Sequence, residues 1–453
     1  MTSKVIRIPD KLVLPLIILI ALIFRLSLTN IAFHGDLVVQ AGWGKWIYLN
    51  KSMFGFYENN VWIYGWPNQP PLISFLYGFG FKIHEWLNTY FVGIGNFIAL
   101  NHLGAAHIPW FYKFTVWFNT QIYSDTPYVR GQLISLKLIP ILGDLVLAWI
   151  IYLLAKNLAN TKKAIFIVII YLLSPFSWYE SAIWGQHDQL STIFLLLSLL
   201  LLTNKAKFLA PILFLISIGI KPTGVIFAPL FLLFSLKNKK IFLKIIAGSL
   251  IALFLYFLLG KLISPNNFLI FNSNLSKQMF AKNDWATWRN VYNFWRLFTG
   301  PQTDSRILFL GISYQIWGYI LFGLINLYAY LTNRKLEFWS ILKALFIISF
   351  GGWLFMTTMH ERYLFTAVVT GLLLTVKYPK LFVWWLILSI VFWLNLYNDW
   401  FEPGSWVLVK NLLTWPNELL VAKLLSVIMI TLFFIMTWII KERSGEKIPS
   451  IRK

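Results

Sequence analysis

The chain has 453 residues, of which 58% are hydrophobic, 18% are aromatic and only 12% are charged. This composition excludes a disordered chain, which would be poor in apolar and aromatic residues, and the lack of cysteine excludes a disulfide scaffold and cysteine-ligated zinc. The net charge of +22, in a chain this apolar, indicates a multi-pass membrane protein with basic anchors rather than a nucleic-acid-binding protein.

Apolar runs able to enter or cross a bilayer recur along the chain. The first, 12–28, follows basic residues and precedes no small-residue cleavage site, so we interpret it as an uncleaved first helix. Together the runs predict an all-α polytopic membrane protein with about twelve transmembrane helices. The others lie near 131–155, 164–182, 190–203, 207–220, 224–236, 241–263, 306–332, 337–357, 364–376, 381–397 and 419–440.

Every second loop between these runs is short and basic, as shown by Lys162 with Lys163 and by Lys377 with Lys380. This is the positive-inside pattern, and it places both basic termini in the cytoplasm. The opposite face has a long helical first segment at about 30–130, loops near 264–305 and 398–418, and most of the acidic residues. We therefore expect the functional residues on the extracytoplasmic face.

The long first outer segment contains apolar stretches that are short for a span. A full crossing near 71–82 would invert every later loop and turn the basic loops outward. We therefore predict three helices, 37–50, 71–87 and 88–118, which lie in or dip into the outer interface. Their many Trp and Tyr residues favour the headgroup level.

Two outer clusters combine ionisable and flexible residues. The first is His34-Gly35-Asp36, where Asp36 is either a functional carboxylate or the N-cap of the following helix. The second is the turn Trp184-Gly185-Gln186-His187-Asp188-Gln189, which has more aromatic and polar chemistry than a plain turn needs. Ionisable groups beside spans are costly and suggest function.

Two more outer clusters are cationic. Lys221 lies between apolar runs that are too short to cross fully, so it is predicted to be sunk below the surface, where it would bind an anion unless it snorkels. The adjacent residues His360, Glu361, Arg362 and Tyr363 interrupt an apolar stretch, and Arg362 offers a fork for phosphate unless it only pairs with Glu361.

Two further features are interpreted as structural. The segment 284–296 repeats Asp, Trp, Arg, Asn and Tyr at helical spacing, which favours an interfacial helix over a sugar-binding or lipid-binding surface. Lys137 and Asp144 lie seven residues apart on one predicted span, which favours a buried ion pair between them.

Several catalytic motifs are missing. The chain has no Walker A loop, no Gly-rich dinucleotide turn, no His-Glu-x-x-His and no Asp-x-Asp pair. We therefore expect no cofactor, no bound metal and no nucleic-acid partner, and a substrate that arrives already in the membrane.

The order of these elements resembles the GT-C superfamily of polytopic glycosyltransferases, which use polyprenyl- or dolichyl-phosphate sugars. Asp36 after the first span is followed by Gly55-Phe56-Tyr57, by Trp66-Pro-Asn-Gln-Pro-Pro-Leu72 and by Lys137-Leu-Ile-Pro-Ile-Leu-Gly-Asp144. Trp184-Gly-Gln-His-Asp188, Lys221-Pro222 and His360-Glu-Arg-Tyr363 then follow in the family order. The similarity covers about residues 10–370, and His187 stands where relatives often carry Phe.

This resemblance implies two units, a catalytic transmembrane module at 1–370 and C-terminal helices with a short basic cytoplasmic tail at 371–453. It implies an inverting hexosyltransferase of mannosyl- or glucosyltransferase type, with Asp36 as the general base. Lys221, His360 and Arg362 would bind the donor phosphate. The sugar or the acceptor would contact Trp184, Gln186, His187, Asp188, Glu361 and Tyr363.

The expected partners are a polyprenyl-phosphate-linked sugar donor, a glycan, lipid or protein acceptor, and membrane lipids. The expected location is the cell membrane, as in a bacterial inner membrane, with the active site outside the cytoplasm. Two alternatives remain open. The spans also suit a transporter or lipid flippase, although such proteins tend to show internal repeats and midplane sites. A glycan polymerase or ligase with a lipid-diphosphate donor would also work at the outer face.

Overall fold

The computed structural model describes residues 10–57, 67–100, 109–123, 126–204, 206–236, 238–264, 286–287, 290–300, 303–333, 335–400, 406–414 and 416–442. Within these ranges the chain is almost entirely helical, and its sheet is one hairpin of β1 (Leu308–Phe309) and β2 (Ile312–Ser313). The predicted all-α class is therefore confirmed. The expected basic tail at 443–453 lies outside the described residues, as do Trp66, Asp284, Trp285, Trp288 and Arg289.

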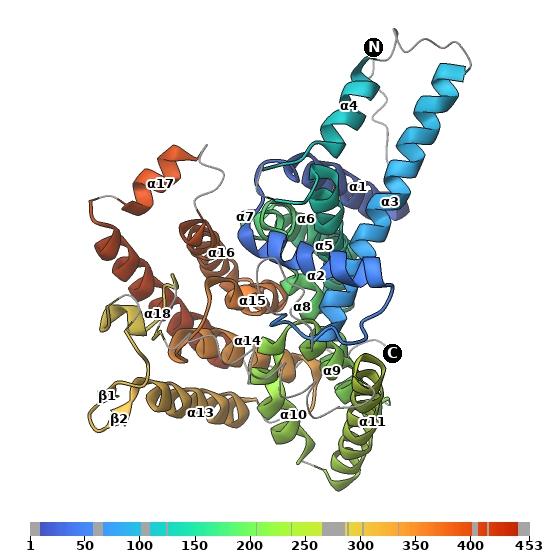
Figure 1. Cartoon of the computed structure of the whole chain (residues 1–453). Coiled ribbons are helices and arrows are strands. Elements are labelled where there is room, and N and C mark those ends of the chain that lie inside the picture. Colours follow the sequence, from blue (N-terminus) through green and yellow to red (C-terminus); the bar gives the residue numbers. More distant parts are fainter. Residues whose placement is uncertain are drawn as a thin grey trace, which may run out of the picture.

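The N-terminal half forms one group of helices (Figure 1). α5 and α8 stand at its centre, α2 crosses in front of them, and α3 and α4 extend away from the rest. The elements are α1 (Asp10–Leu28), α2 (Gly35–Asn50), α3 (Pro71–Leu100), α4 (Pro109–Asn119), α5 (Arg130–Leu158), α6 (Thr161–Leu173), α7 (Pro175–Trp178), the π-helix η1 (Tyr179–Trp184) and α8 (Asp188–Thr203).

The C-terminal half packs against this group mainly through α9, which lies along α8, and also through α14, α15 and α16 (Figure 1). Its elements are η2 (Lys207–Leu209), α9 (Ala210–Ile220), η3 (Pro222–Phe227), α10 (Ala228–Ser235), α11 (Lys239–Ile263), η4 (Trp295–Leu297), α13 (Tyr314–Thr332), α14 (Phe338–Phe355), η5 (Glu361–Leu364), α15 (Phe365–Thr375), α16 (Leu381–Asp399), α17 (Val407–Thr414) and α18 (Glu418–Glu442).

Several spans begin at a polar cap. Asn160 accepts a hydrogen bond from the Lys163 amide at the start of α6, and Asn238 does the same for the Lys240 amide at the start of α11. A capping side chain satisfies one of the backbone amides that a helix start leaves unpaired. These short polar sequences therefore fix where the apolar helices begin.

Five described helices are long and apolar enough to cross a membrane, namely α5, α11, α14, α16 and α18. Helix α6 and the α7–η1 segment satisfy the same criterion together, with a 54° bend between them. α1, α8 and the segments 207–220 and 222–235 are apolar but shorter. The chain is thus a helical membrane protein whose described part contains five or six helices long and apolar enough to span a bilayer, and the total of twelve spans stays a prediction.

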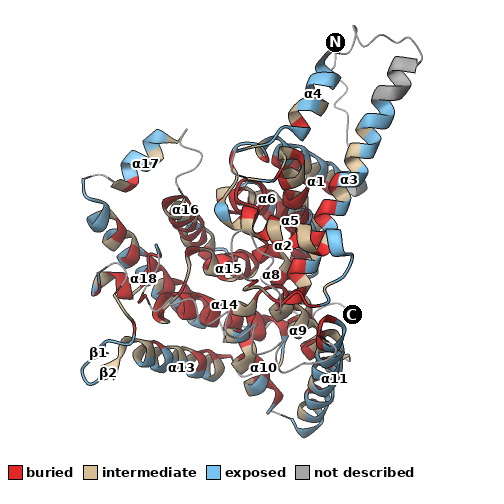
Figure 2. Ribbon diagram, viewed as in Figure 1, coloured by how far each residue is buried: buried red, intermediate tan, exposed pale blue. Residues whose placement is uncertain are grey.

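Burial separates the centre of the molecule from its lipid-facing rim (Figure 2). Every residue of α14 is buried, so this helix forms the core of the C-terminal half. In contrast, α11 exposes large apolar side chains, including Leu250, Leu253 and Phe254. Large apolar faces of this kind are stable in lipid but not in water, so α11 is expected to line the membrane-facing surface.

The first outer segment differs in part from the prediction. The helix expected at 37–50 is present as α2, but α3 runs without interruption from Pro71 to Leu100. The predicted division into 71–87 and 88–118 is therefore wrong. No Gly or Pro lies within three residues of the Leu87–Asn88 junction to end the helix there. Gly44 lets the two helices meet closely, since a Cβ there would lie 2.7 Å from the Tyr77 backbone.

The interfacial helix expected at 284–296 is not formed in its described part. Residues 290–294 are irregular, and only the short turn η4 follows them. Side chains bind the backbone N–H groups here. Asn293 accepts a hydrogen bond from the Arg296 amide, and Asn395 accepts one from the Tyr292 amide. Such bonds compete with the helical pattern, which the sequence spacing could not reveal.

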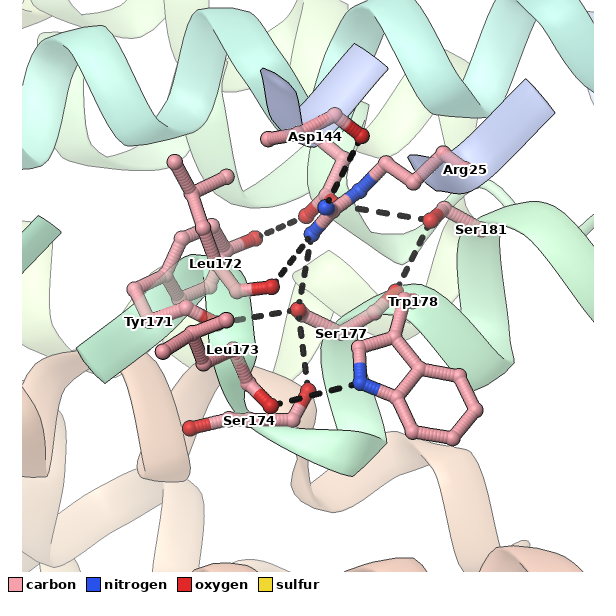
Figure 3. Close-up of polar contacts among 10 residues, drawn as sticks. Arg25, Asp144, Tyr171, Leu172, Leu173, Ser174, Ser177, Trp178 and Ser181 are labelled. Atoms are coloured by element: carbon pink, nitrogen blue, oxygen red, sulfur yellow. Dashed lines mark hydrogen bonds and ion pairs between the residues drawn. The ribbon is translucent and has the colours of Figure 1, made fainter. Parts of the chain in front are cut away.

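A buried ion pair joins α1 to α5 (Figure 3). The Arg25 Nε donates to Asp144 Oδ2 at 2.6 Å, and both side chains are fully buried. Arg25 also donates to Ser177 Oγ at 3.0 Å, and Tyr171 donates its hydroxyl to Asp144. The network therefore fixes the first span and the bend after α6 to one point on α5.

The predicted pairing of Lys137 with Asp144 is wrong. Lys137 instead donates to the carbonyls of Thr29 and Ala32, at 2.7 and 2.6 Å, and its Nζ lies over the Phe33 ring. Lys137 and Asp144 do share helix α5. However, Asp144 pairs with Arg25 of α1, and Lys137 binds the chain just after α1. Lys137 thus anchors the chain just before α2, where the first outer cluster begins.

Removing the arginine from the buried pair is expected to destabilise the protein strongly. Arg25→Met leaves the Asp144 charge buried without a cation, which costs about 3–5 kcal/mol in comparable pairs. Thermal unfolding of the purified protein should show a clearly lower midpoint, and adding Asp144→Leu should restore most of it. The exposed Lys82, which pairs with Glu85, supplies the control Lys82→Met, which should change little. Equal effects of Arg25→Met and Lys82→Met would contradict the assignment.

Candidate active site

Asp36 is the first residue of the site along the chain. The helix N-cap is His34, because its Nδ1 accepts a hydrogen bond from the Asp36 amide at 2.9 Å. The alternative that Asp36 is the cap is therefore wrong. Its side chain keeps 39% of its surface exposed, so the carboxylate is free of a capping role and accessible to another molecule.

Three side chains meet the Asp36 carboxylate, and two of them come from distant parts of the sequence. Gln186 Nε2 donates to Asp36 Oδ2 at 2.8 Å. The same oxygen lies 3.7 Å from Arg362 Nη2 and 3.7 Å from His34 Nδ1. Three of the predicted outer clusters therefore converge on one carboxylate.

A π-helical turn presents the second cluster to Asp36. The segment η1 ends at Gly185, whose φ is +85°, and the Glu180 carbonyl accepts the amides of both Gly185 and Gln186. Single π-helical turns occur frequently at functional sites. Here the turn reverses the chain so that the Gln186 side chain faces α2, while Trp184 is fully buried beneath it.

The turn is expected to tolerate no side chain at Gly185. An alanine Cβ would meet the Leu37 side chain at 3.1 Å and the Lys137 side chain at 3.3 Å, in a backbone conformation that costs a non-glycine residue about 1–3 kcal/mol. Gly185→Ala should therefore lower the thermal unfolding midpoint. The control Gly93→Ala, at an exposed position of α3 with no neighbour near its Cβ, should be neutral or slightly stabilising. An unchanged midpoint for Gly185→Ala would refute this role.

The fourth cluster supplies an oriented guanidinium. Arg362 Nη1 donates to Glu361 Oε1 at 2.7 Å, and Glu361 is fully buried. The guanidinium also lies over the rings of Trp184 and Tyr363, at 5.6 and 5.8 Å. Because Glu361 and the two rings hold one side of the group, the Nη2 side is directed toward Asp36.

His360 lies at the margin of this cluster. Its Nδ1 is 3.8 Å from Glu361 Oε2, its ring contacts Tyr363, and 22% of its side chain is exposed. The indole of Trp353 donates to the His360 carbonyl at 2.9 Å, which fixes the turn before η5. His360 is therefore close to Arg362 but remains accessible from outside.

Lys221, the third cluster, is buried within the protein, and its predicted depth in the membrane stays a prediction. Lys221 connects α9 to η3, it is only 5% exposed, and its Nζ forms an ion pair with Asp188 at the start of α8. The ammonium also lies 5.2 Å from the Tyr363 ring centroid. Tyr363 thus contacts both Lys221 and Arg362, and joins the two cationic clusters.

Glu180 was missed by the sequence reasoning. It is fully buried in η1, and its carboxylate interacts electrostatically with Asp188 and Lys221. Its charge inside an apolar run is visible in the sequence, but no role could be assigned to it because its partners come from other helices. The structure therefore adds a second carboxylate to the Lys221 environment.

His187 is buried below the site. Its Nδ1 shares a 2.8 Å hydrogen bond with the Tyr77 hydroxyl of α3. Burial, together with the nearby Lys221 charge, lowers the pKa of His187 to about 3, so the ring is neutral at physiological pH. His187 thus links α3 to the turn through Tyr77, and its contact with a sugar or acceptor stays a prediction.

The charge state of Asp36 follows from its neighbours. Partial burial alone would raise the pKa of this carboxyl. The charge of Arg362, the nearby His34 and His360, and the hydrogen bond from Gln186 together bring the pKa below its ordinary value. Asp36 is therefore ionised at neutral pH. It can accept a proton without first having to lose one.

A small cavity lies on the Lys221 side of the site. Its volume is about 40 Å³, and its lining includes Asp188, Lys221, Thr223, Trp353, Tyr363 and Thr366. Among the described residues, no three His, Asp or Glu side chains are arranged to hold a metal ion. The recognisable chemistry is thus a carboxylate beside fixed cations.

Comparison with known proteins adds no identity to this description. No protein-family model matches the sequence, and no curated protein matches it significantly. Inferences about function therefore depend on the side chains of the site and on the motif order described above.

Proposed function

We propose that the protein is an inverting hexosyltransferase, of mannosyl- or glucosyltransferase type, that uses a polyprenyl-phosphate sugar. The observation that carries this proposal is the position of the Asp36 carboxylate, 3.7 Å from Arg362 Nη2. The same arginine contacts the Tyr363 ring, which also contacts Lys221. A base next to fixed cations suits a reaction in which a hydroxyl loses a proton while a phosphate leaves.

The proposed step needs two complementary charges. Asp36 takes the proton of an acceptor hydroxyl as that oxygen attacks the anomeric carbon, and the bond from this carbon to the phosphate oxygen breaks. Polyprenyl phosphate leaves with the bonding electrons, and the attack from the opposite side inverts the anomeric configuration. Fixed cations stabilise the developing phosphate charge, which is often a large part of catalysis.

Arg362 and Lys221 suit the phosphate for different reasons. Arg362 offers a planar fork whose Nη1 already binds Glu361, so its Nη2 remains for an anion. Lys221 is a buried point charge paired with Asp188, and a phosphate would have to compete with that carboxylate. His360, which is partly exposed, would add a third donor at the outer edge.

The sidedness of the reaction is part of the proposal. The basic loops predict that the site faces away from the cytoplasm in the cell membrane, where the sugar would arrive on its lipid and the acceptor from outside. Gln186, Asp188 and Tyr363 would then contact the sugar or its phosphate from the membrane side. A glycan, a lipid or a protein could supply the acceptor hydroxyl.

A donor comparison tests the proposal. The full chain in lipid nanodiscs is incubated with polyprenyl-phosphate mannose or glucose, and separately with the corresponding diphosphate sugars, together with methyl glycosides as acceptors. Mass spectrometry should detect polyprenyl phosphate and an extended glycoside with the monophosphate donors. Turnover with diphosphate donors alone would favour a polymerase or ligase instead. If the lipid-linked donor moved across the membrane of proteoliposomes and no glycosylated product formed, a flippase would be favoured.

A further inference from the structure

We infer that Asp399, Asn290 and Trp400 form a binding site for a neutral sugar ring of the acceptor. The inference rests on the proposed function, and it assigns to the acceptor a chemical class that the reaction alone leaves open. The three residues lie outside the motifs that suggested the function. They come from the end of α16 and from the irregular segment before η4.

Trp400 places this site directly beside Asp36. Its ring centroid lies 4.7 Å from that of His34 in an edge-on contact, and 6.1 Å from that of Trp184. His34 in turn caps the helix that carries Asp36. The His34 Nδ1 also lies 3.7 Å from Asp36 Oδ2, so a single imidazole connects Trp400 to the proposed base.

Trp400 is held in place but not enclosed. The buried Tyr179 donates its hydroxyl to the Trp400 carbonyl at 2.8 Å. Trp400 itself is half-buried, so part of its indole remains accessible. Aromatic faces are good partners for apolar surface, and the C–H face of a pyranose ring is such a surface.

Two hydrogen-bonding groups accompany the indole. Asn290 Nδ2 donates to Asp399 Oδ1 at 2.7 Å. A carboxylate accepts several hydrogen bonds, and an amide offers both donors and an acceptor, so this pair still has capacity for the hydroxyls of a ligand. Asn290 is exposed and Asp399 is half-buried, which leaves that capacity reachable.

The backbone around Asn290 is preorganised. Its φ is +45°, a left-handed conformation that asparagine tolerates better than most residues. The buried Asn395 side chain donates to the Asn290 carbonyl and accepts from the Tyr292 amide at 3.2 Å. One amide thus holds the two peptide groups that flank Val291, which fixes the course of the chain directly after Asn290.

Charge selects the class of acceptor. Asp399 interacts electrostatically with Glu361 as well as with Arg362 and His360. A ligand that contacts the Asp399 carboxylate directly meets its negative charge there, which disfavours an anionic group at the point of contact. The geometry therefore favours an uncharged sugar with free hydroxyls over a phosphorylated or uronic acid acceptor.

The test separates sugar binding from donor turnover. Saturation-transfer NMR measures binding of methyl α-mannoside and methyl α-glucoside to the full chain in nanodiscs, and a parallel assay follows slow hydrolysis of the lipid-phosphate donor. Asp399→Asn and Trp400→Ala should each weaken binding of the preferred glycoside at least about tenfold, equivalent to 1.4 kcal/mol. Trp400→Ala should leave donor hydrolysis and the donor KM unchanged, whereas Asp399→Asn is judged by glycoside binding alone, because Asp399 interacts electrostatically with Arg362 and His360.

The control is Asp304→Asn, a matched change at an exposed carboxylate that pairs with Arg306 near the β1–β2 hairpin. It should leave glycoside binding unaffected. Unchanged binding in Asp399→Asn and in a folded Trp400→Ala, or no binding of either glycoside to the wild type, would overturn the inference. Glycoside binding that depends on Asp399 without any donor turnover would instead remove the proposed function and keep the sugar site.

Discussion

Asp36→Asn is expected to reduce glycosyl transfer by about 10²–10⁴-fold, the usual contribution of a positioned general base. Asparagine keeps the shape and can still accept the hydrogen bond from Gln186, so the site should remain assembled. It cannot take a proton from the acceptor. Initial rates with a polyprenyl-phosphate sugar in nanodiscs give the measurement.

The matched control for this prediction is Glu85→Gln. Glu85 is an exposed carboxylate on α3, in the same outer segment, and it pairs only with nearby groups of its own surface. Its neutralisation should leave the rate within twofold of the wild type. If Asp36→Asn kept a rate close to that of Glu85→Gln, Asp36 could not be the base.

The pH dependence gives Asp36 a second signature. Its pKa lies below the ordinary value near 4, so the carboxylate stays ionised on going from pH 8 to pH 5. Loss of the base form on acidification should begin only below about pH 4. Any fall in the transfer rate between pH 5 and 7 would therefore have to come from another group, such as a histidine.

The sequence predicted the site better than it predicted the surrounding packing. Asp36, Gln186 and Arg362 were expected together because ionisable groups beside apolar runs are costly and the charge pattern put them on one face. In the structure, Gln186 and Arg362 both lie beside the Asp36 carboxylate. Local patterns were thus enough, because each cluster interrupts an apolar run.

Pairings between helices could not be predicted in this way. The seven-residue spacing of Lys137 and Asp144 correctly put both on one helix, yet Arg25 from α1 took the carboxylate and backbone carbonyls took the lysine. Spacing along one helix says nothing about which neighbour packs against it. The same limit explains why no role could be assigned to Glu180 from the sequence, since its interactions with Asp188 and Lys221 depend on how the helices pack.

Element boundaries failed for a related reason. The segment 284–296 had helical spacing of aromatic residues, but side-chain amides of Asn293 and Asn395 bind the backbone that a helix would need. Asn395 lies about a hundred positions away along the chain, so no local pattern could include it. The consequence is functional as well, because this clamp builds the Asn290 surface.

Arg362→Gln is expected to lower kcat by about 10²–10³-fold, as removal of one group that stabilises a developing anion does in other enzymes. The guanidinium is the cation nearest to Asp36, and its Nη2 is the part that Glu361 does not bind. Arg362→Lys should recover only part of the rate, because a point charge cannot bind Glu361 and reach the phosphate with two separate, fixed N–H groups as the fork does. The control Arg306→Gln removes an exposed arginine and should leave kcat unchanged. Since glutamine would also leave the buried Glu361 without its cation, the unfolding midpoint must be measured beside kcat. A midpoint that falls while kcat of the folded fraction stays at the wild-type value would make Arg362 a structural partner of Glu361 rather than a phosphate-binding residue.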